Sequence, residues 1–532
     1  MTRRGSIAVT HPRLDADKLG PFRFGRIDDK VLLTHDTGQW HLLSEPDFEA
    51  LLAGTLGPDH PDHAALVDKG FIRDGMDADA IADRLRRKKR WLGMGPHLHV
   101  VITTLRCNQS CKYCHASRTD MDRVDTDMSI DTARLVVDHA LRSPSPFIAF
   151  EFQGGEPTVN MDVIRFIVEY SRERNRNEGK TIEYSLVTNM TRMDEDKAEW
   201  LLANDVFLCT SLDGPRHVHD WNRPFAGGQG SAPFDEVMKW VQYFNRRYVE
   251  MGRDPELWHV DALMTTTRKT LEHWREVIDL YVSLGIRNLY LRPLNPFGFI
   301  MKTWKAVGYD QEDFLRFYEQ ALDYIIDLNR DGVQIIEGTA ALFLKKMLTP
   351  DDPNFVDLRS PIGAGTGQIA YNYDGTIFPS DEGRMVDAMG DPIFALGRLG
   401  ELTPDEAIGH PTVKALAVAS LLDTLPMCST CWNAPYCGVR PLHNYMMSGD
   451  LFGQRPNTPK CKQHMTIARL LFERLSRDTD GSLEAIFRRW TLERPRETPP
   501  PDLDADGDAG ASPAASSPAS GDAAPDSAAA TE

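Results

Sequence analysis

Residues 104–118 read TLRCNQSCKYCHASR, and they place Cys107, Cys111 and Cys114 within eight residues. The spacing is C-x3-C-x2-C, with Tyr113 directly before the last cysteine. The stretch is polar and follows the strand-like run HLHVVITTL. No secretory signal pattern is evident, and clustered thiols in a cytosolic chain favour a metal site over disulfides.

Three thiolates suit a cubane iron–sulfur cluster better than zinc. A structural zinc site takes four protein ligands, and the usual 4Fe–4S cluster takes four thiolates. With three, one iron keeps an open position that a substrate or cofactor can occupy. The alternative is three unrelated core thiols, which the short spacing in a polar loop disfavours.

From residue 97 onward, strand-like runs alternate with amphipathic segments of helical length. This alternation predicts parallel strands with helical crossovers, and six such units predict a partial or full β/α barrel. The six runs are HLHVVITTL, FIAFEF, IEYSLVTN, VFLCTSL, WHVDALMT and NLYLRPL. Residues 331–475 break this rhythm, and they contain a predicted hairpin around Asp374-Gly375 and a final helix, QHMTIARLLFERLSR.

The polar motifs of the chain fall at the ends of the predicted strands. In parallel β/α folds the active site collects at the carboxyl ends of the strands. We therefore expect these motifs to converge on one mouth of the sheet. They are the three cysteines, the segment Gly154-Gly155-Glu156-Pro157, the pair Thr188-Asn189, and the segment Ser211-Leu212-Asp213-Gly214.

Residues 20–95 predict a small module ahead of the barrel. Three short strands are followed by a helix with Ser44 as its N-cap and Gly54 as its stop. A second helix, ALVDKGFI, is expected to run into a strand, and the basic run RRKKR is expected to be a solvated helix face or linker.

Composition limits the possible partners and location. The chain has 532 residues and a formal charge of -18, which argues against a general nucleic-acid binder. No apolar run is long enough to span a bilayer, so we expect a cytoplasmic protein that does not act at a membrane. After Arg496 there are eight acidic residues and no Lys or Arg, and residues from about 497 are predicted to be disordered.

Four more cysteines form a second group near the C-terminus, and Cys209 stands alone as a predicted small buried hydrophobe. The group consists of Cys428, Cys431, Cys437 and Cys461. Their number fits either one four-thiolate iron–sulfur cluster or a structural zinc site, and iron analysis separates the two.

The cysteine loop and the GGEP segment resemble those of the radical SAM enzymes. The resemblance implies a partial (β/α)6 barrel over residues 96–330. It also implies a 4Fe–4S cluster on Cys107, Cys111 and Cys114, and an open iron that binds S-adenosylmethionine. One electron from the cluster then cleaves the cofactor to a 5′-deoxyadenosyl radical. Cofactor contacts are implied at Tyr113, Gly154, Gly155, Glu156, Asn189, Ser211 and Arg223, with Glu156 facing the methionine ammonium and Arg223 a carboxylate. Asp213-Gly214 is interpreted as a turn.

The second cysteine group resembles the SPASM extension of radical SAM peptide maturases, over residues 331–478. Ile362, Ser380 and Pro441 stand where that family has cysteine, which implies one auxiliary 4Fe–4S cluster rather than two. Asp381 matches a general base of relatives that oxidise serine or cysteine side chains; the alternative is a solvated aspartate at a hairpin end.

The whole combination is most similar to the radical SAM maturases of the His-Xaa-Ser system. The resemblance implies a ribosomally made precursor peptide as substrate, with its leader held by a winged-helix-like module at residues 20–95. It also implies a reductase, flavodoxin or ferredoxin as electron donor, and further maturation proteins as partners. Residues 1–19 and 479–532 are flanking segments. Alternatives are a sulfatase-maturase-like oxidase and a non-catalytic peptide-binding subunit.

Overall fold

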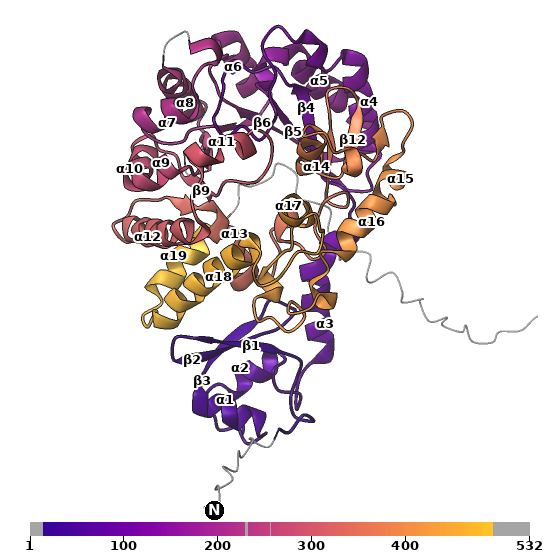
Figure 1. Ribbon diagram of the computed structural model, residues 1–532. Coiled ribbons are helices and arrows are strands. Elements are labelled where there is room, and N and C mark those ends of the chain that lie inside the picture. Colours follow the sequence, from indigo (N-terminus) through magenta and orange to yellow (C-terminus); the bar gives the residue numbers. More distant parts are fainter. Residues whose placement is uncertain (1–13, 229–231, 256, 493–532) are drawn as a thin grey trace, which may run out of the picture. The chain divides into compact units, whose positions relative to one another are not determined.

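The computed structural model describes residues 14–228, 232–255 and 257–492 (Figure 1), so the predicted disordered tail lies outside it. Its main feature is a ten-stranded sheet in the order β10-β9-β8-β7-β6-β5-β4-β11-β12-β13. The strands are β4 (Leu98–Thr104), β5 (Phe147–Gly154), β6 (Thr181–Thr188), β7 (Val206–Thr210), β8 (Asp261–Thr265), β9 (Asn288–Arg292), β10 (Ile336–Glu337), β11 (Gln368–Tyr371), β12 (Thr376–Phe378) and β13 (Gly397–Arg398).

All six predicted strands are present, and each pairs in parallel with the next. Helices connect them, which confirms the predicted β/α alternation. The connecting helices are α4 (Ile130–Leu141), α5 (Met161–Glu178), α6 (Glu195–Ala203), α7 (Arg216–Asn222), α8 (Pro233–Glu250), α9 (Arg268–Glu272) and α10 (Trp274–Ser283). After β9 come α11 (Ile300–Val307) and α12 (Gln311–Arg330).

The parallel sheet is larger than the sequence predicts. The short strand β10 adds to β9, and β11 of the predicted hairpin pairs in parallel with β4. The hairpin around Asp374-Gly375 itself is confirmed, because β11 and β12 pair antiparallel on either side of it. Residues after 331 therefore extend the sheet at both ends.

Side chains of the parallel strands alternate between two environments. On β7, β8 and β9 every second residue is fully buried, and the residues between are partly exposed. The buried set, such as Leu208, Met264 and Leu291, packs with apolar helix residues in the main core. The face of the sheet opposite this core, called the inner face below, thus keeps contact with solvent. It carries polar groups such as Asp261 and Arg292.

The N-terminal module is a three-stranded antiparallel sheet with helices, as predicted. Ser44 caps the first helix by accepting a hydrogen bond from the Asp47 backbone N–H at 3.2 Å. The elements are β1 (Arg23–Ile27), β2 (Lys30–Thr34), β3 (Trp40–Ser44), α1 (Glu45–Leu52), α2 (His63–Asp68) and α3 (Ala78–Lys89). The predicted strand after α2 is wrong: Ile72 makes only an isolated bridge with Leu19.

The basic run on α3 is not uniformly solvated. Lys88 is buried, and its Nζ donates to the carbonyls of Lys346, Thr349 and Asp351 at 2.7–3.0 Å. Burial lowers the pKa of Lys88 to about 8. The expectation of a solvated face is therefore wrong at this position, because the side chain ties α3 to residues 346–351.

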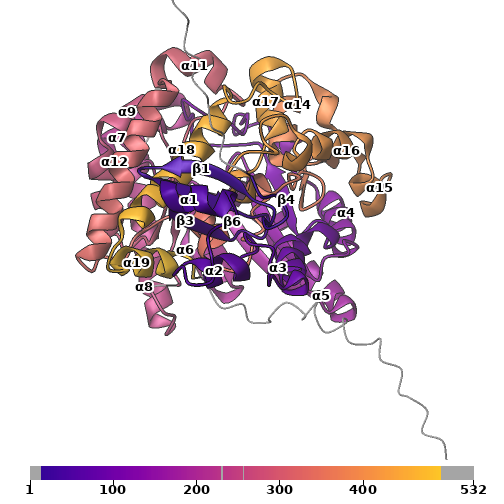
Figure 2. The same cartoon turned by 90° about the horizontal axis from the view of Figure 1, so that it is seen from below.

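The C-terminal segment is mostly helical and packs against the module. Its helices are α13 (Gly338–Leu348), α14 (Asp381–Asp387), α15 (Pro404–Ile408), α16 (Pro411–Val418), α17 (Pro441–Ser448), α18 (Pro459–Arg477) and α19 (Ser482–Trp490). The helix predicted over residues 463–477 is confirmed as part of α18, which lies beside β1 (Figures 1 and 2), where Arg469 donates to the Arg26 carbonyl.

Trp432 anchors the contact between the module and the C-terminal segment. Its backbone carbonyl accepts a hydrogen bond from the Thr34 hydroxyl at 2.8 Å, and its indole lies directly against Gly25. Trp40 of β3 also donates from its indole to the Met347 carbonyl at 3.0 Å. The module is therefore part of the packed body rather than a loosely tethered domain.

In the part of the chain that the structure describes, none of the helices combines the length and apolarity needed to cross a bilayer.

A Gly25→Ala substitution should destabilise the protein. The added Cβ would lie 2.4 Å from the Trp432 ring, which is buried and cannot move aside freely. Overpacking of this kind costs about 1–3 kcal/mol of unfolding free energy, measurable as a lower thermal midpoint. Gly57→Ala is the control, since nothing lies within 4 Å of its added Cβ. Equal midpoints for the two variants would contradict this packing.

Candidate functional site

The three cysteines lie in a loop that follows β4. Cys107 is buried, and Cys111 and Cys114 are half-buried. Backbone hydrogen bonds fix the loop: Cys107 N–H donates to the Thr119 carbonyl at 3.1 Å, and Cys114 N–H donates to the Cys111 carbonyl at 3.2 Å. The Gln109 N–H points at the Cys107 sulfur at 3.4 Å. The structure thus places the three cysteines together at the carboxyl end of β4, the first strand of the large sheet in chain order.

The surroundings of these thiols fit a cationic cluster. Burial raises the pKa of Cys107 well above its ordinary value, and the neighbouring thiol of Cys111 adds to the effect. Burial also raises the pKa of Cys111 to about 12, against the opposing charge of Arg223. Metal ligation requires thiolates, and grouped buried thiolates need compensating positive charge. A 4Fe–4S core would supply that charge, so the residues present suit it.

The GGEP segment packs directly beneath the cysteine loop. Gly155 N–H donates to the Thr104 carbonyl at 2.8 Å, and Glu156 N–H donates to the Arg106 carbonyl at 2.8 Å. A Cβ at Gly154, whose φ is +150°, would lie 2.1 Å from the Thr104 carbonyl oxygen. Only glycine permits this approach. The two predicted motifs are therefore brought together.

The Glu156 carboxylate is directed into the protein. It is fully buried, and it accepts hydrogen bonds from both the hydroxyl and the N–H of Thr158, from the Thr188 hydroxyl, and from the Asn189 N–H, at 2.6–3.2 Å. Burial raises its pKa, and these donors oppose the rise. With four protein donors the side chain braces the ends of β5 and β6. Three of these donors bind Oε1 and only the Asn189 N–H binds Oε2, so the contact of Glu156 with a methionine ammonium stays a prediction.

Asn189 reaches the cysteine loop from the end of β6. Its side-chain nitrogen lies 3.7 Å from the Cys107 sulfur and 3.3 Å from the Asn108 side-chain oxygen. Ser211, at the end of β7, is half-buried, and its N–H donates to the Thr188 carbonyl at 3.1 Å. Both residues lie at the predicted mouth.

Asp213 organises the other side of the cysteine loop, which the interpretation as a simple turn missed. Its buried carboxylate accepts hydrogen bonds from the Tyr113 hydroxyl at 2.5 Å and from the Asn222 side chain at 2.9 Å. It also pairs with the Arg223 guanidinium at 3.2 Å. Burial alone would lower the pKa of Arg223, but the Asp213 carboxylate outweighs it and raises that pKa well above the ordinary value.

Arg223 therefore already has a carboxylate partner within the chain. Its Nη1 lies 3.8 Å from the Cys111 sulfur, and its guanidinium lies over the Tyr113 ring. The arginine brings positive charge next to a thiol that must become a thiolate to bind metal. The segment RHVHDWNR at residues 216–223, which contains Asn222 and Arg223, is the sequence signal of this network.

The segment after β9 covers the cysteine loop. Phe299 N–H donates to the Cys114 carbonyl at 2.9 Å, and the Thr303 hydroxyl of α11 donates to the Lys112 carbonyl. A Cβ at Gly298 would lie 2.5 Å from the Cys114 carbonyl oxygen, and the φ of this glycine is +68°. Residues 298–303 thus close over the loop. In the sequence, Gly298 within NPFGF is the feature that could have predicted the close approach of this segment to the Cys114 backbone.

The inner face of the sheet supplies polar groups next to this loop. Glu151 of β5 and Arg292 of β9 both point to this side, and burial raises the pKa of Glu151, with the charge of Asp381 adding to it. Cys209 of β7 also lies on this inner face, where it is half-buried rather than fully buried as predicted. These groups could contact a substrate that enters the sheet mouth.

The four C-terminal cysteines are also brought together. Cys428 is buried, and the other three are half-buried. Burial raises the pKa of Cys428 to about 11, and the thiols of Cys431 and Cys461 contribute to that rise. Cys461 lies in the first turn of α18, where its N–H donates to the capping Thr458 hydroxyl at 3.4 Å. This arrangement can hold a four-thiolate metal centre.

The positions that lack cysteine are filled by packing. Ile362 is buried in an apolar cluster with Phe297 and Leu442. Ser380 is buried and caps α14, and Pro441 is the first residue of α17. Asp381, also on α14, forms an ion pair with Arg384 at 2.8 Å, and its side chain is 15% exposed. It is therefore neither solvated nor free of a partner.

Comparison with known proteins gives the same picture. Residues 101–280 match the Radical SAM superfamily. An uncharacterized protein of Methanocaldococcus jannaschii is 27% identical over 200 residues, covering 38% of this chain and 63% of that protein. The cysteine-type anaerobic sulfatase-maturating enzyme of Clostridium perfringens is 25% identical over 284 residues, covering 52% of this chain and 71% of that enzyme.

A solved structure supports the fold. Native anSMEcpe with bound AdoMet and the Cp18Cys peptide superimposes with a TM-score of 0.60 at 20% identity, covering 74% of this chain and 100% of that chain. Residues 101–280 are thus similar to radical SAM proteins, and a longer stretch of the chain is similar to the anaerobic sulfatase-maturating enzymes. The matched range contains the cysteine loop, GGEP, Asn189, Ser211 and Arg223.

An Asp213→Asn substitution should weaken the cysteine loop. It removes the charge that partners Arg223, and breaking one side of a buried ion pair costs about 3–5 kcal/mol. We expect a lower thermal midpoint and less iron per chain after anaerobic reconstitution. Asp235→Asn, which breaks an exposed pair with Arg216, is the control. If both variants match the wild type in iron and midpoint, Asp213 does not hold the loop.

Proposed function

We propose that this protein is a radical SAM maturase that modifies side chains of a ribosomally synthesised peptide. Cys107, Cys111 and Cys114 would hold the 4Fe–4S cluster, and the mouth around them would bind S-adenosylmethionine. When bound, these groups supply a 5′-deoxyadenosyl radical that removes a hydrogen atom from the substrate. The observation that carries the proposal is the gathering of three thiols, without a fourth, at the mouth of a parallel sheet.

The chain's own residues would position and shield this chemistry. Glu156 and Asp213 fix the loop from two sides, so the thiolates are held before the cofactor arrives. Residues 298–303 cover the loop and would limit access of water. Tyr113, Gly154, Gly155, Asn189 and Ser211 remain the proposed cofactor contacts, with the glycines offering backbone rather than side-chain groups.

Cys428, Cys431, Cys437 and Cys461 would hold one auxiliary 4Fe–4S cluster, and zinc is the alternative. In a mononuclear zinc site, four sulfurs at about 2.3 Å from the metal lie only about 3.8 Å apart. The described residues contain a single group of three or more potential ligands within 4.8 Å of one another, and it contains no cysteine. The wider spacing of the thiols favours the larger cluster.

A precursor peptide is the proposed substrate, and His-Xaa-Ser repeats are its proposed sequence. The polar inner face, with Glu151 and Arg292, could receive the peptide. A reductase, flavodoxin or ferredoxin would supply electrons, and other maturation proteins would act on the same peptide. The solved relative with a bound Cp18Cys peptide supports a peptide substrate as a class.

A second candidate is oxidation of a cysteine or serine side chain in a sulfatase-like target. The relation to the Clostridium perfringens enzyme favours it, and Asp381 would be the general base. The pairing of Asp381 with Arg384 disfavours this role, because one of its two carboxylate oxygens is already bound to the guanidinium. Formation of an aldehyde in a sulfatase-derived peptide would support this second candidate.

The cysteine triplet should be required for cofactor cleavage. Reconstituted, anaerobically reduced protein is expected to release 5′-deoxyadenosine from S-adenosylmethionine. The variant Cys107→Ala/Cys111→Ala/Cys114→Ala should release none and should lose about four iron atoms per chain. Cys209→Ala, outside both cysteine groups, should retain iron and cleavage. Release of the nucleoside by the triple variant would refute the proposed function.

The leader of the peptide should bind along β3. Within the described residues no other strand pairs with the outer edge of β1 or of β3. Helix α18 lies beside β1, where Arg469 donates to the Arg26 carbonyl, whereas on β3 Lys69 donates to the Trp40 carbonyl. Because a whole helix lies beside β1, we place the added strand on β3. Deletion of the module would also strip the packing around Trp432, so amide hydrogen exchange is the better test.

Leader peptide should slow amide exchange at residues 40–44. An added strand shields backbone N–H groups from water, so protection is expected at β3 and not at β1, residues 23–27. A control peptide of the same composition in scrambled order should give no protection. Tight peptide binding without any protection at residues 40–44 would refute this docking mode.

A further inference from the structure

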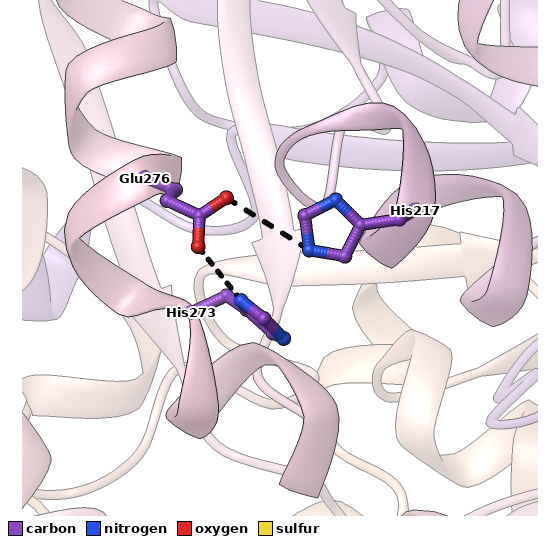
Figure 3. Close-up of side chains that lie close together, drawn as sticks. All are labelled: His217, His273 and Glu276. Carbon is purple, nitrogen blue, oxygen red and sulfur yellow. Dashed lines mark hydrogen bonds and ion pairs between the residues drawn. The ribbon is translucent and has the colours of Figure 1, made fainter.

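Two histidines and a glutamate form a compact surface group on the outer helices of the domain (Figure 3). His273 Nδ1 lies 2.8 Å from one carboxylate oxygen of Glu276, and His217 Nε2 lies 3.8 Å from the other. The two imidazole rings are 4.4 Å apart between centroids and nearly perpendicular. One ligand atom from each of the three residues lies within 4.8 Å of the others.

These separations suit a single tetrahedral metal ion. Ligands at about 2.0–2.1 Å from zinc lie about 3.3–3.5 Å apart, and in this group one ligand atom from each residue lies within 4.8 Å of the other two. Small side-chain rotations would bring these atoms to the separations that zinc requires. Two imidazoles and one carboxylate are a ligand set that zinc uses, and it leaves a fourth position for water.

The group is open to solvent, which gives a metal ion an entry path. The side chains of His217, His273 and Glu276 are 47%, 31% and 55% exposed. The ligands come from two helices, since His217 is in α7 and Glu276 is in α10, with His273 directly before α10. A bound ion would therefore cross-link α7 to α10.

The cross-link would act on the segment that holds the cysteine loop. α7 ends at Asn222, whose side chain donates to Asp213, and Arg223 follows. On the other side, Val277 of α10 packs against Gly214, where a Cβ would lie 2.5 Å from its methyl carbon. The surface group thus lies over the Asp213-Gly214 turn and adjoins both helices that contact it.

We propose that His217, His273 and Glu276 form a zinc-binding site that clamps α7 onto α10 and stabilises the turn behind the cysteine loop. The site is separate from both cysteine groups, and it does not depend on the proposed peptide chemistry. Without metal, the group is held by the hydrogen bond between His273 and Glu276 and by the contact of His217 with Glu276 at 3.8 Å.

Titration of the full-length, anaerobically reconstituted protein with Zn²⁺ tests the site. Calorimetry should show one binding event per chain, and Zn²⁺ should raise the thermal midpoint. In His217→Ala and in the conservative variant Glu276→Gln we expect at least tenfold weaker binding and no rise in the midpoint. Iron is assayed throughout, so that displacement from the clusters is not counted as binding.

Glu272→Gln is the matched control. Glu272 is an exposed carboxylate on the neighbouring helix α9, and it is outside the group of three. This variant should bind Zn²⁺ as the wild type does. An unchanged isotherm in both His217→Ala and Glu276→Gln would overturn the proposal, and so would loss of binding in Glu272→Gln.

Discussion

The close approach of Gly154 and Gly155 to the backbone of residues 104–106 is the constraint on which the site depends. The cysteine loop has little regular structure of its own, and its ordering costs entropy that packing must offset. Two backbone hydrogen bonds of 2.8 Å join the loop to the end of β5 at a distance that no side chain would allow. This constraint extends to β6, because the Glu156 carboxylate accepts a hydrogen bond from the Asn189 N–H at the end of that strand. Three strand ends are thereby locked before any cofactor binds.

The opposite side of the loop is held by charge rather than by close backbone contact. Asp213 and Arg223 are both buried, and such a pair stabilises only when its remaining hydrogen-bonding groups are also satisfied. Tyr113 and Asn222 provide two of those partners for the carboxylate. The network places a guanidinium beside Cys111, where negative charge would develop in the proposed metal-bound thiolate. Positioning of the loop and charge compensation are therefore achieved by the same residues.

Local pattern predicted the strands, the crossovers and the cysteine loop, because each is encoded by periodicity or spacing within a short window. It did not predict that β11 would pair with β4, since that contact joins residues some 270 positions apart with no pattern of its own. The sequence predicts only a turn at Asp213, because the hydrogen bond of its carboxylate with Tyr113 joins residues a hundred positions apart. It predicts a solvated Lys88 for the same reason, since the carbonyls that accept from this lysine lie at the end of a distant helix.

Asp381 shows how packing changes the meaning of a sequence match. Its carboxylate accepts a hydrogen bond from Arg384 Nε, and Arg384 Nη1 donates to the Ala116 carbonyl at 3.2 Å, two residues after Cys114. The aspartate thus orients a buried arginine that supports the cysteine loop. Directly before α17, Arg440 pairs with Asp357 and Glu382 at 2.8 and 2.9 Å. At the positions where the SPASM resemblance implied further cysteines, this chain has apolar packing beside half-buried ion pairs. The C-terminal segment therefore supports the mouth of the sheet through α14, and a proton-transfer role for Asp381 would have to use the carboxylate oxygen that Arg384 does not bind.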